Sequence, residues 1–397
     1  MPVRLPTPSR SGSGLSYLIA QSYRCLSYPR QARTSFLTLS THTFSSSKAW
    51  KLKSRHSTAM AGLFQLLHMR CSPPNDPQDI SFSGKVVLLT GATSGLGFEA
   101  AIKILNLGAD RLIIGSRDIE RGKAARMEIE RATHRPNTIK VWELEMSSFQ
   151  SVKSFTDRVN AELPRLDIAL LNAGIWNAAY NQSAEGWEET LQVNTLSTSL
   201  LALLLIPKLR RSATATEPAH LSVVSSQKFV RVKAETLQTD DLLLPHLNQQ
   251  VNFNGPKQYS ISKLLLEFMV KKIAGLSRNE DGSHPLIVNT VSPGFCASGL
   301  GRQYNQWYEK CFMWLFTKLL ARTSEEGSRS LVSATVQGVE SQGKCWYSDT
   351  YVNESRALTT GPHAEELQEK VWAEVIAVLE EEAPEVSIIS RGVYQGV

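Results

Sequence analysis

The stretch that decides the fold reads Lys85-Val86-Val87-Leu88-Leu89-Thr90-Gly91-Ala92-Thr93-Ser94-Gly95-Leu96-Gly97. It opens with an apolar run typical of a buried strand, and a helical pattern follows as far as Leu107. The three glycines allow a tight turn and the close approach of a ligand to the backbone. A helix that begins here points its free N–H groups and the positive end of its dipole at the loop, which suits a pyrophosphate. We therefore predict a nucleotide-binding loop.

Beyond this loop, apolar runs alternate with amphipathic stretches. The predicted strands cover residues 85–89, 112–114, 139–144, 167–171, 220–225 and 286–291. Helical patterns lie at about 118–131, 148–162, 185–211, 257–276 and 363–381. Strands joined through helices imply right-handed crossovers and a parallel sheet that is covered on both faces. The expected fold class is α/β, with one doubly wound parallel sheet in a single domain over residues 82–385 and a tail at 386–397.

The first 81 residues are interpreted as an N-terminal extension. Residues 1–75 hold ten Lys and Arg and no acidic residue. Because the formal net charge of the whole chain is +6, residues 76–397 have four more acidic than basic residues. The Ser- and Arg-rich stretch 1–59 fits a mitochondrial or plastid transit peptide, whereas a disordered tail or a translation start at Met60 fits it as well. We expect an intracellular protein, cytoplasmic or, with a transit peptide, mitochondrial.

The composition argues against several classes of partner. The mildly acidic body lacks a dense basic stripe, which argues against nucleic acid. There is no run of 18 apolar residues, so we expect no membrane-spanning helix. His220, His246 and His284 lack metal-ligand spacing, and we expect no metal. The five cysteines contain no C-x-x-C pair and are expected to be reduced thiols.

A second motif, Tyr259-Ser260-Ile261-Ser262-Lys263, lies on the helical pattern at 257–276. Positions i and i+4 share a helix face, so the phenol and the ammonium face the same pocket. With the loop T-G-x-x-x-G-x-G at residues 90–97, this pair resembles the short-chain dehydrogenase/reductase family over most of residues 83–380. The pattern is most similar to the retinol-dehydrogenase-like branch and to fungal-type reductases, some of which serve secondary metabolism. The resemblance implies a Rossmann fold, oxidoreductase activity and a nicotinamide cofactor.

The resemblance also implies which residues bind that cofactor. Ser116 stands at the adenosine ribose, where an acid would repel a 2′-phosphate, and the Arg117 guanidinium can pair with that phosphate. NADP(H) is therefore expected rather than NAD(H). The alternative interpretation is that Arg117 is a surface arginine that opens a helix beside Asp118 and binds no cofactor. The full predicted set is Thr90, Gly91, Ser94, Gly95, Leu96, Gly97, Ser116, Arg117, Glu145, Met146, Asn172, Ala173, Gly174, Tyr259, Lys263, Pro293, Gly294 and Ser298.

The same resemblance assigns the catalytic residues Ser226, Tyr259, Lys263 and Asn194. Tyr259 is the expected general acid and base, since Lys263 and an oxidised nicotinamide both favour the phenolate and lower its pKa from about 10. Ser225 and Ser226 both follow the fifth strand, and Ser226 matches the family position for the hydroxyl that holds the substrate oxygen. Asn194 would open a kink in the long helix and hold a water that relays protons to Lys263.

The expected substrate is a small hydrophobic carbonyl or alcohol compound. Residues 297–322 would form a lid over it, and the insertion 227–256 a substrate loop. An apolar pocket is indicated by six aromatic residues in the lid: Tyr304, Trp307, Tyr308, Phe312, Trp314 and Phe316. Packing on the core and peripheral contact with a membrane surface are the alternatives for these side chains. The family resemblance also implies a homodimer.

Two other functions are compatible with the motifs. One is a non-catalytic NADP-binding regulator. The presence of all four catalytic residue types argues against it. The other is an epimerase or dehydratase that returns the hydride to its product, which likeness of fold alone does not exclude.

Overall fold

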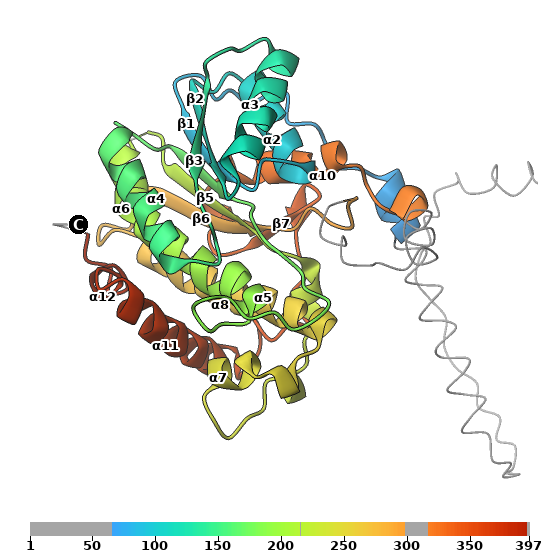
Figure 1. Cartoon of the computed structure of the whole chain (residues 1–397), viewed down its shortest axis with the longest axis vertical. Coiled ribbons are helices and arrows are strands. Elements are labelled where there is room, and N and C mark those ends of the chain that lie inside the picture. The colour runs from blue at the N-terminus through green and yellow to red at the C-terminus, as the bar shows by residue number, and fades with distance from the viewer. Residues whose placement is uncertain (1–65, 215, 298–316, 395–397) are drawn as a thin grey trace, which may run out of the picture. The chain divides into compact units, whose positions relative to one another are not determined.

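The computed structural model describes residues 66–214, 216–297 and 317–394, all within one unit of the chain, Thr58–Val397. Its centre is an eight-stranded sheet in the order β3-β2-β1-β4-β5-β6-β7-β8 (Figure 1). Neighbouring strands are parallel except for the last pair. The predicted doubly wound parallel sheet is confirmed. Its strands are β1 (Val86–Thr90), β2 (Arg111–Ser116), β3 (Ile139–Glu143), β4 (Ile168–Leu171), β5 (Ala219–Val224), β6 (Leu286–Val291), β7 (Cys345–Tyr347) and β8 (Thr350–Tyr351).

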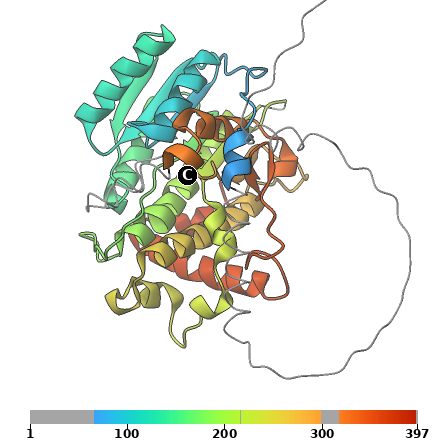
Figure 2. The same ribbon diagram turned by 90° about the vertical axis from the view of Figure 1, so that its right-hand side faces the viewer.

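Strand β1 has apolar side chains on both faces of the sheet, so helices must pack against both faces. Val86 and Leu88 belong to one hydrophobic cluster, and Val87 and Leu89 to another, because successive side chains of a strand point to opposite faces. Figures 1 and 2 show two groups of helices with the strands between them. The first cluster is completed by α4 (Phe149–Glu162), α6 (Thr198–Ser212), α8 (Gly255–Leu276) and α11 (Ala364–Glu382), and the second by α2 (Gly95–Asn106), α3 (Ile119–Thr133) and α10 (Ser324–Ala334).

The sequence patterns do not predict three of these elements. Strands β7 and β8 are two or three residues long, too short to show a period. Helix α10 begins with a capping box, in which the Thr323 hydroxyl accepts from the Glu326 N–H at 3.1 Å and the Glu326 carboxylate from the Thr323 N–H at 2.7 Å. That Thr-x-x-Glu signal is readable in the sequence. Before α8 begins at Gly255, the insertion 227–256 holds short helices: η2 (Gln227–Arg231), η3 (Ala234–Thr236), α7 (Leu243–Asn248) and η4 (Gln250–Asn252).

The prediction of one long helix at 185–211 is wrong in two respects: the helix begins later, and its geometry is not regular throughout. It begins with α5 (Glu189–Leu191), passes through the π-helical turn η1 (Gln192–Ser197), and continues as α6. Over Glu189–Ser212, the mean hydropathy of 1.4 and the length of 24 residues would suit a membrane span, but the apolar window is 100% buried inside the protein. Burial all round is what the core helix of a large α/β domain shows.

The packed body begins before residue 82, where the extension was expected to end. Residues 66–71 form a helix, drawn in blue in Figures 1 and 2 beside the orange segment that contains α10. The buried Arg322 guanidinium donates to the Met69 carbonyl at 3.0 Å and to the Ser72 carbonyl at 2.8 Å. These bonds fasten the segment before the first strand to Arg322, the last residue of the predicted lid.

The body also continues past residue 385. Helix α12 (Val386–Ile389) buries Val386 and Ile389 in the same cluster as α6 and α11. The Tyr394 hydroxyl donates to the Leu276 carbonyl at the end of α8, at 2.7 Å. The predicted tail 386–397 is therefore packed at least to residue 394.

Candidate active site

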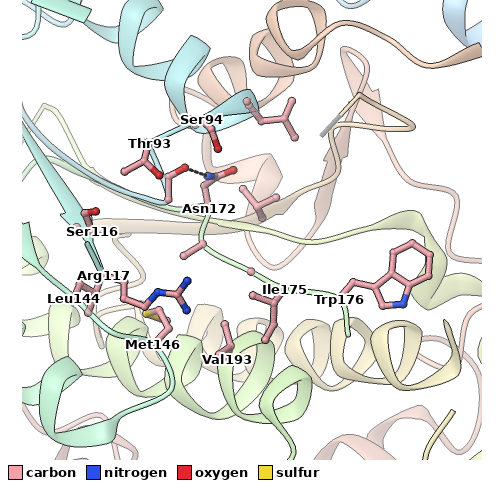
Figure 3. Close-up of a pocket in the computed structure, with 18 of the residues that line it drawn as sticks. Thr93, Ser94, Ser116, Arg117, Leu144, Met146, Asn172, Ile175, Trp176 and Val193 are labelled. Atoms are coloured by element: carbon pink, nitrogen blue, oxygen red, sulfur yellow. Dashed lines mark hydrogen bonds between the residues drawn. The ribbon is translucent and has the colours of Figure 1, made fainter. Parts of the chain in front are cut away.

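A cavity of about 600 Å³ lies at the carboxyl ends of the strands. It lies at β1 and β4, where the strand order reverses, and open α/β sheets bind their ligands at this position. Figure 3 shows Ser116 and Arg117 at one end of the cavity and Trp176 at the other, with Asn172 and Ile175 between them. The cavity is therefore long enough to receive different parts of one ligand at its two ends.

Most of the predicted site residues line this cavity. Three do not: Thr90 and Asn194 lie behind its wall, and Ser298 is outside the described residues, as are the six aromatic residues of the lid. Those that line it are Gly91, Ser94, Gly95, Leu96, Gly97, Ser116, Arg117, Glu145, Met146, Asn172, Ala173, Gly174, Ser226, Tyr259, Lys263, Pro293 and Gly294.

The glycine loop leaves room for a ligand against the backbone. Gly91 and Gly95 have φ values of 69° and 60°, in the left-handed region that other residues rarely adopt. A Cβ atom on Gly97 would lie 2.3 Å from the Gly91 carbonyl oxygen, so a side chain at this position does not fit. Helix α2 begins at Gly95, and its first N–H groups have no partner within the helix. This cradle fits the pyrophosphate of a dinucleotide.

Thr90 supports the cavity from behind instead of facing a ligand. It is buried, and its hydroxyl accepts from the N–H groups of Asn172 and Ala173, both at 2.9 Å. The Asn172 amide in turn donates to the carbonyls of Thr90 and Gly91, at 3.0 and 3.1 Å. Thr90 is thus corrected from a cofactor contact to a residue that joins the ends of β1 and β4.

The adenosine end of the cavity carries two arginines. Asp118 lines the cavity and also caps α3, where one of its carboxylate oxygens accepts from the Arg121 N–H at 3.0 Å. Arg117 has a side chain that is 75% exposed, and its Nε lies 3.4 Å from a Glu145 carboxylate oxygen. Arg121 also lines the cavity and is absent from the predicted set. Both arginines therefore line the cavity.

The tyrosine and the lysine are both buried, on one face of α8. Burial raises the pKa of Tyr259 to about 12, and its interaction with the Ser226 hydroxyl opposes that rise. The predicted lowering of this pKa by Lys263 and an oxidised nicotinamide concerns the protein with its cofactor bound and stays a prediction. Burial also lowers the pKa of Lys263 to about 8, while Glu267, one turn further along α8, raises it. The Lys263 ammonium donates to the Val224 carbonyl at 2.8 Å.

The two candidate serines face different partners. Ser226 interacts with the phenol of Tyr259, whereas the Ser225 hydroxyl is buried and has no hydrogen-bond partner among the described residues. The structure therefore brings Ser226, and not Ser225, to the phenol. Ser226 follows β5 and Tyr259 lies in α8, so the insertion 227–256 separates them in sequence only.

Asn194 lies in the π-helical turn η1, beneath the cavity wall. Its Nδ2 donates to the Ile175 carbonyl at 2.8 Å and to the Ser262 hydroxyl at 3.1 Å, and its Oδ1 accepts from the Ile175 N–H at 2.9 Å. The predicted irregularity of the helix at Asn194 is present as this π turn. A Cβ on Gly174 would lie 3.1 Å from Oδ1 and 3.7 Å from the Lys263 Nζ, so Gly174 leaves space between them.

Sequence comparison places this geometry in a known family. A family model described as short chain dehydrogenase matches residues 85–228. The short-chain dehydrogenase/reductase ffsI of Aspergillus flavipes is 40% identical over 316 residues, which are 79% of this chain and 91% of the relative. Another, phmF of Phaeosphaeria nodorum, is 39% identical over 327 residues, 82% of this chain and 95% of the relative. The chain belongs to the short-chain dehydrogenase/reductase family. The family's members are oxidoreductases, and the expected likeness to fungal members is confirmed.

Solved structures of family members show the same fold. The RhlG/NADP active-site complex of Pseudomonas aeruginosa aligns with a TM-score of 0.52 at 22% identity, over 70% of this chain and 97% of that one. A short chain dehydrogenase from Shigella flexneri aligns with a TM-score of 0.51 at 20% identity, over 69% and 94%. At these identities the likeness concerns the fold alone.

Several lining residues of this family member have no signal in the sequence. Trp176 and Ile175 follow the Asn-Ala-Gly turn after β4, and a loop of this kind has no periodic pattern that would place its side chains. Cys296, on the turn after β6, also lines the cavity, and burial raises the pKa of its thiol to about 12. The remaining additions are Thr93, Gly115, Asp118, Leu144, Ser147, Asn177, Asn181, Glu189, Val193, Val224 and Ser225.

Proposed function

We propose that the protein is an NADP(H)-dependent oxidoreductase that interconverts a hydrophobic carbonyl compound and its alcohol. The observation that carries this proposal is the meeting of Ser226, Tyr259 and Lys263 in one cavity with the glycine loop of residues 91–97. A buried phenol beside a hydroxyl and an ammonium is a group that donates a proton to a developing alkoxide. A protein that only bound the nucleotide would have no use for this group.

The chain's own residues then act on the oxygen of the substrate. When bound, the cofactor supplies or accepts a hydride at the carbonyl carbon. Tyr259 gives its proton to the carbonyl oxygen, and Ser226 donates a hydrogen bond to the same oxygen as negative charge grows there. Lys263, charged below its pKa of about 8, stabilises the phenolate that is left. Asn194 donates to the hydroxyl of Ser262, the residue before Lys263 on α8. A water that relays protons to Lys263 stays a prediction.

The preference for NADP(H) over NAD(H) rests on the adenosine end. Arg117 and Arg121 provide two guanidinium groups for a 2′-phosphate, and Asp118, the nearest acid in sequence, is occupied as the cap of α3. Ser116 donates its hydroxyl hydrogen bond to the Asp118 carbonyl at 2.7 Å, so no carboxylate stands in its place to bind the ribose hydroxyls. An arginine that pairs with phosphate favours the phosphorylated cofactor.

A single assay tests the proposed function. The purified full chain is incubated with NADPH or NADH and a panel of hydrophobic aldehydes and ketones, and cofactor oxidation is followed at 340 nm, the absorption band of reduced nicotinamides. We expect oxidation of NADPH with at least one neutral aryl or alkyl ketone, and slower oxidation of NADH. Binding of NADPH without oxidation by any carbonyl would favour a regulator, and conversion of substrate without net oxidation would favour an epimerase or dehydratase.

A further inference from the structure

The turn 293–296, which follows β6, contributes three of its residues to the lining of the cavity. It lies beside the candidate serine, because the N–H of Gln227, the residue after Ser226, donates to the Ser292 hydroxyl at 3.2 Å. In the sheet, β6 is separated from β2, the strand that leads to Arg117, by β1, β4 and β5. A dinucleotide whose adenosine lies at Arg117 would therefore place its nicotinamide ring at this turn.

Within the turn, Gly294 lines the cavity and is also packed against side chains from distant parts of the chain. A Cβ atom on this glycine would lie 3.1 Å from the Met69 sulfur, and 3.3 Å from both an Arg322 guanidinium nitrogen and the Tyr347 ring. Met69 is buried, belongs to the helix 66–71 ahead of β1, and does not line the cavity itself. A side chain from before the first strand thus supports the turn from behind.

Polar contacts hold Met69 in this position. The Arg322 guanidinium donates to the Met69 carbonyl at 3.0 Å, and the Arg322 backbone N–H donates to the Phe295 carbonyl at 2.9 Å. The same arginine is therefore bonded both to the turn and to the segment behind it. Arg70, the residue after Met69, pairs with the Glu326 carboxylate at 2.8 Å, at the start of α10.

The chain that follows Met69 is fastened as well. The Arg329 guanidinium, on α10, donates to the Pro74 carbonyl at 3.1 Å. The Lys103 ammonium, on α2, donates to the Asp76 carboxylate at 2.8 Å. Both helices pack on each other in the second hydrophobic cluster, and α2 begins at the glycine loop. The segment 66–76 is thus joined to the elements that surround the cofactor end of the cavity, and it carries Met69 in a defined place.

We propose that Met69 is a positioning residue of the cofactor site, which fixes the turn 293–296 and thereby the place where the nicotinamide ring binds. This inference rests on the proposed function, because it takes the ligand at this turn to be a nicotinamide. Protein interiors are close-packed, so a shorter side chain at residue 69 leaves a gap into which the turn can move. The adenosine end, at Arg117, has no contact with this segment and should be unaffected.

The test compares whole cofactors with fragments that lack the nicotinamide ring. Dissociation constants are measured by calorimetric titration for NADPH and 2′-phospho-ADP-ribose, and for NADH and ADP-ribose. With both pairs, the outcome does not depend on which cofactor the protein prefers. The variants, all made in the full-length chain, are Met69→Ala, the conservative Met69→Leu, and the control Leu67→Ala. Leu67 lies on the same helix and is 40% exposed.

We expect Met69→Ala to weaken binding of the whole cofactor about tenfold and to leave binding of its fragment within about twofold of the wild type. Met69→Leu keeps most of the side-chain volume and should restore cofactor binding to within about threefold. Leu67→Ala should change none of the constants by more than about twofold. With a ketone that the wild type reduces, Met69→Ala should also lower kcat at saturating cofactor, because hydride transfer needs an aligned donor.

Equal losses for a cofactor and its fragment in Met69→Ala would overturn this inference, because Met69 would then only stabilise the fold. Unchanged cofactor binding would overturn it too. If Met69→Ala does not fold, Met69→Val gives the same comparison with a smaller expected loss. A wild type that binds a cofactor but reduces no carbonyl would contradict the proposed function, whereas the binding constants alone decide the role of Met69.

Discussion

Glu267 is a titratable group that the proposed chemistry does not use directly. It is 1% exposed, one carboxyl oxygen accepts from the Thr290 hydroxyl at 2.9 Å, and burial raises its pKa to about 7. In the unfolded chain it ionises above its ordinary pKa of 4.5. Its neutral form is therefore favoured in the folded protein, and stability that is present below pH 4.5 is lost as the pH rises through about 7.

Glu267→Gln should consequently change stability in a pH-dependent way. Relative to the wild type, this variant should be more stable at pH 8 than at pH 5: the difference between variant and wild type in the free energy of unfolding should increase by on the order of 3 kcal/mol. Urea unfolding at the two pH values measures this. Glu381→Gln, on the exposed face of α11, should change stability by less than about 0.5 kcal/mol at either pH. The same variant-to-wild-type difference for Glu267→Gln at both pH values would contradict the assignment.

Replacing the single side chain of Arg117 tests the proposed preference for NADP(H). Arg117→Ala removes the guanidinium proposed for the 2′-phosphate, so KM for NADPH should rise about tenfold while KM for NADH changes little. Lys123→Ala, an exposed position on the helix α3 that follows Arg117, should leave both values as they are. An equal rise for both cofactors would mean that Arg117 contacts a part of the dinucleotide that they share.

The sequence predicts the catalytic residues because their spacing is local. Tyr259 and Lys263 are one helical turn apart, and Ser226 lies two residues after the end of β5. Trp176 and Met69 escape prediction, because their positions depend on how the loop after β4 and the segment before β1 pack in the folded molecule. The pKa of Tyr259 cannot be predicted from the sequence for a related reason. It depends on the burial of this residue, which is 7% exposed in the folded protein.

At the scale of elements, the start of α2 determines how closely a cofactor approaches. Gly97→Ala places a methyl group against the Gly91 carbonyl, so we expect at least a tenfold loss of NADPH affinity and a lower Tm. Gly275→Ala is the matched control, because Gly275 lies in α8, is exposed, and has nothing within 4 Å of an added Cβ. It should raise stability by about 0.5–1 kcal/mol. Fluorescence titration with NADPH and thermal unfolding measure both, and unchanged affinity in Gly97→Ala would contradict the cradle.

Elements with a clear period are predictable, and the others are not. The positions of β1 to β6 and of α3, α4 and α8 agree with their patterns to within about two residues, the margin within which assignments of element ends usually differ. The π turn at Gln192–Ser197 has no sequence period of its own. It arises because the Asn194 amide bonds to both backbone groups of Ile175 in another segment, a contact that only the tertiary fold creates.

At the scale of the whole molecule, Arg322 joins segments from three parts of the chain. Besides its bonds to Met69 and Ser72, it donates to the Ser348 hydroxyl at 2.7 Å, and it is 1% exposed. Arg322→Ala should lower the free energy of unfolding by about 3 kcal/mol, because it leaves buried acceptors without donors. Arg158→Ala, which removes a surface ion pair with Glu162, should cost less than about 1 kcal/mol. Equal effects of the two variants in thermal or urea unfolding would contradict this role.

The central claim is that Tyr259 supplies the proton when a carbonyl is reduced in this cavity. The most direct measurement is the single-turnover rate of NADPH oxidation by Tyr259→Phe and by the wild type, with a ketone that the wild type reduces. We predict a rate that is lower by about 10²–10⁴-fold in the variant, with NADPH affinity within about twofold of the wild type. A variant that reduces the ketone at the wild-type rate would contradict the account.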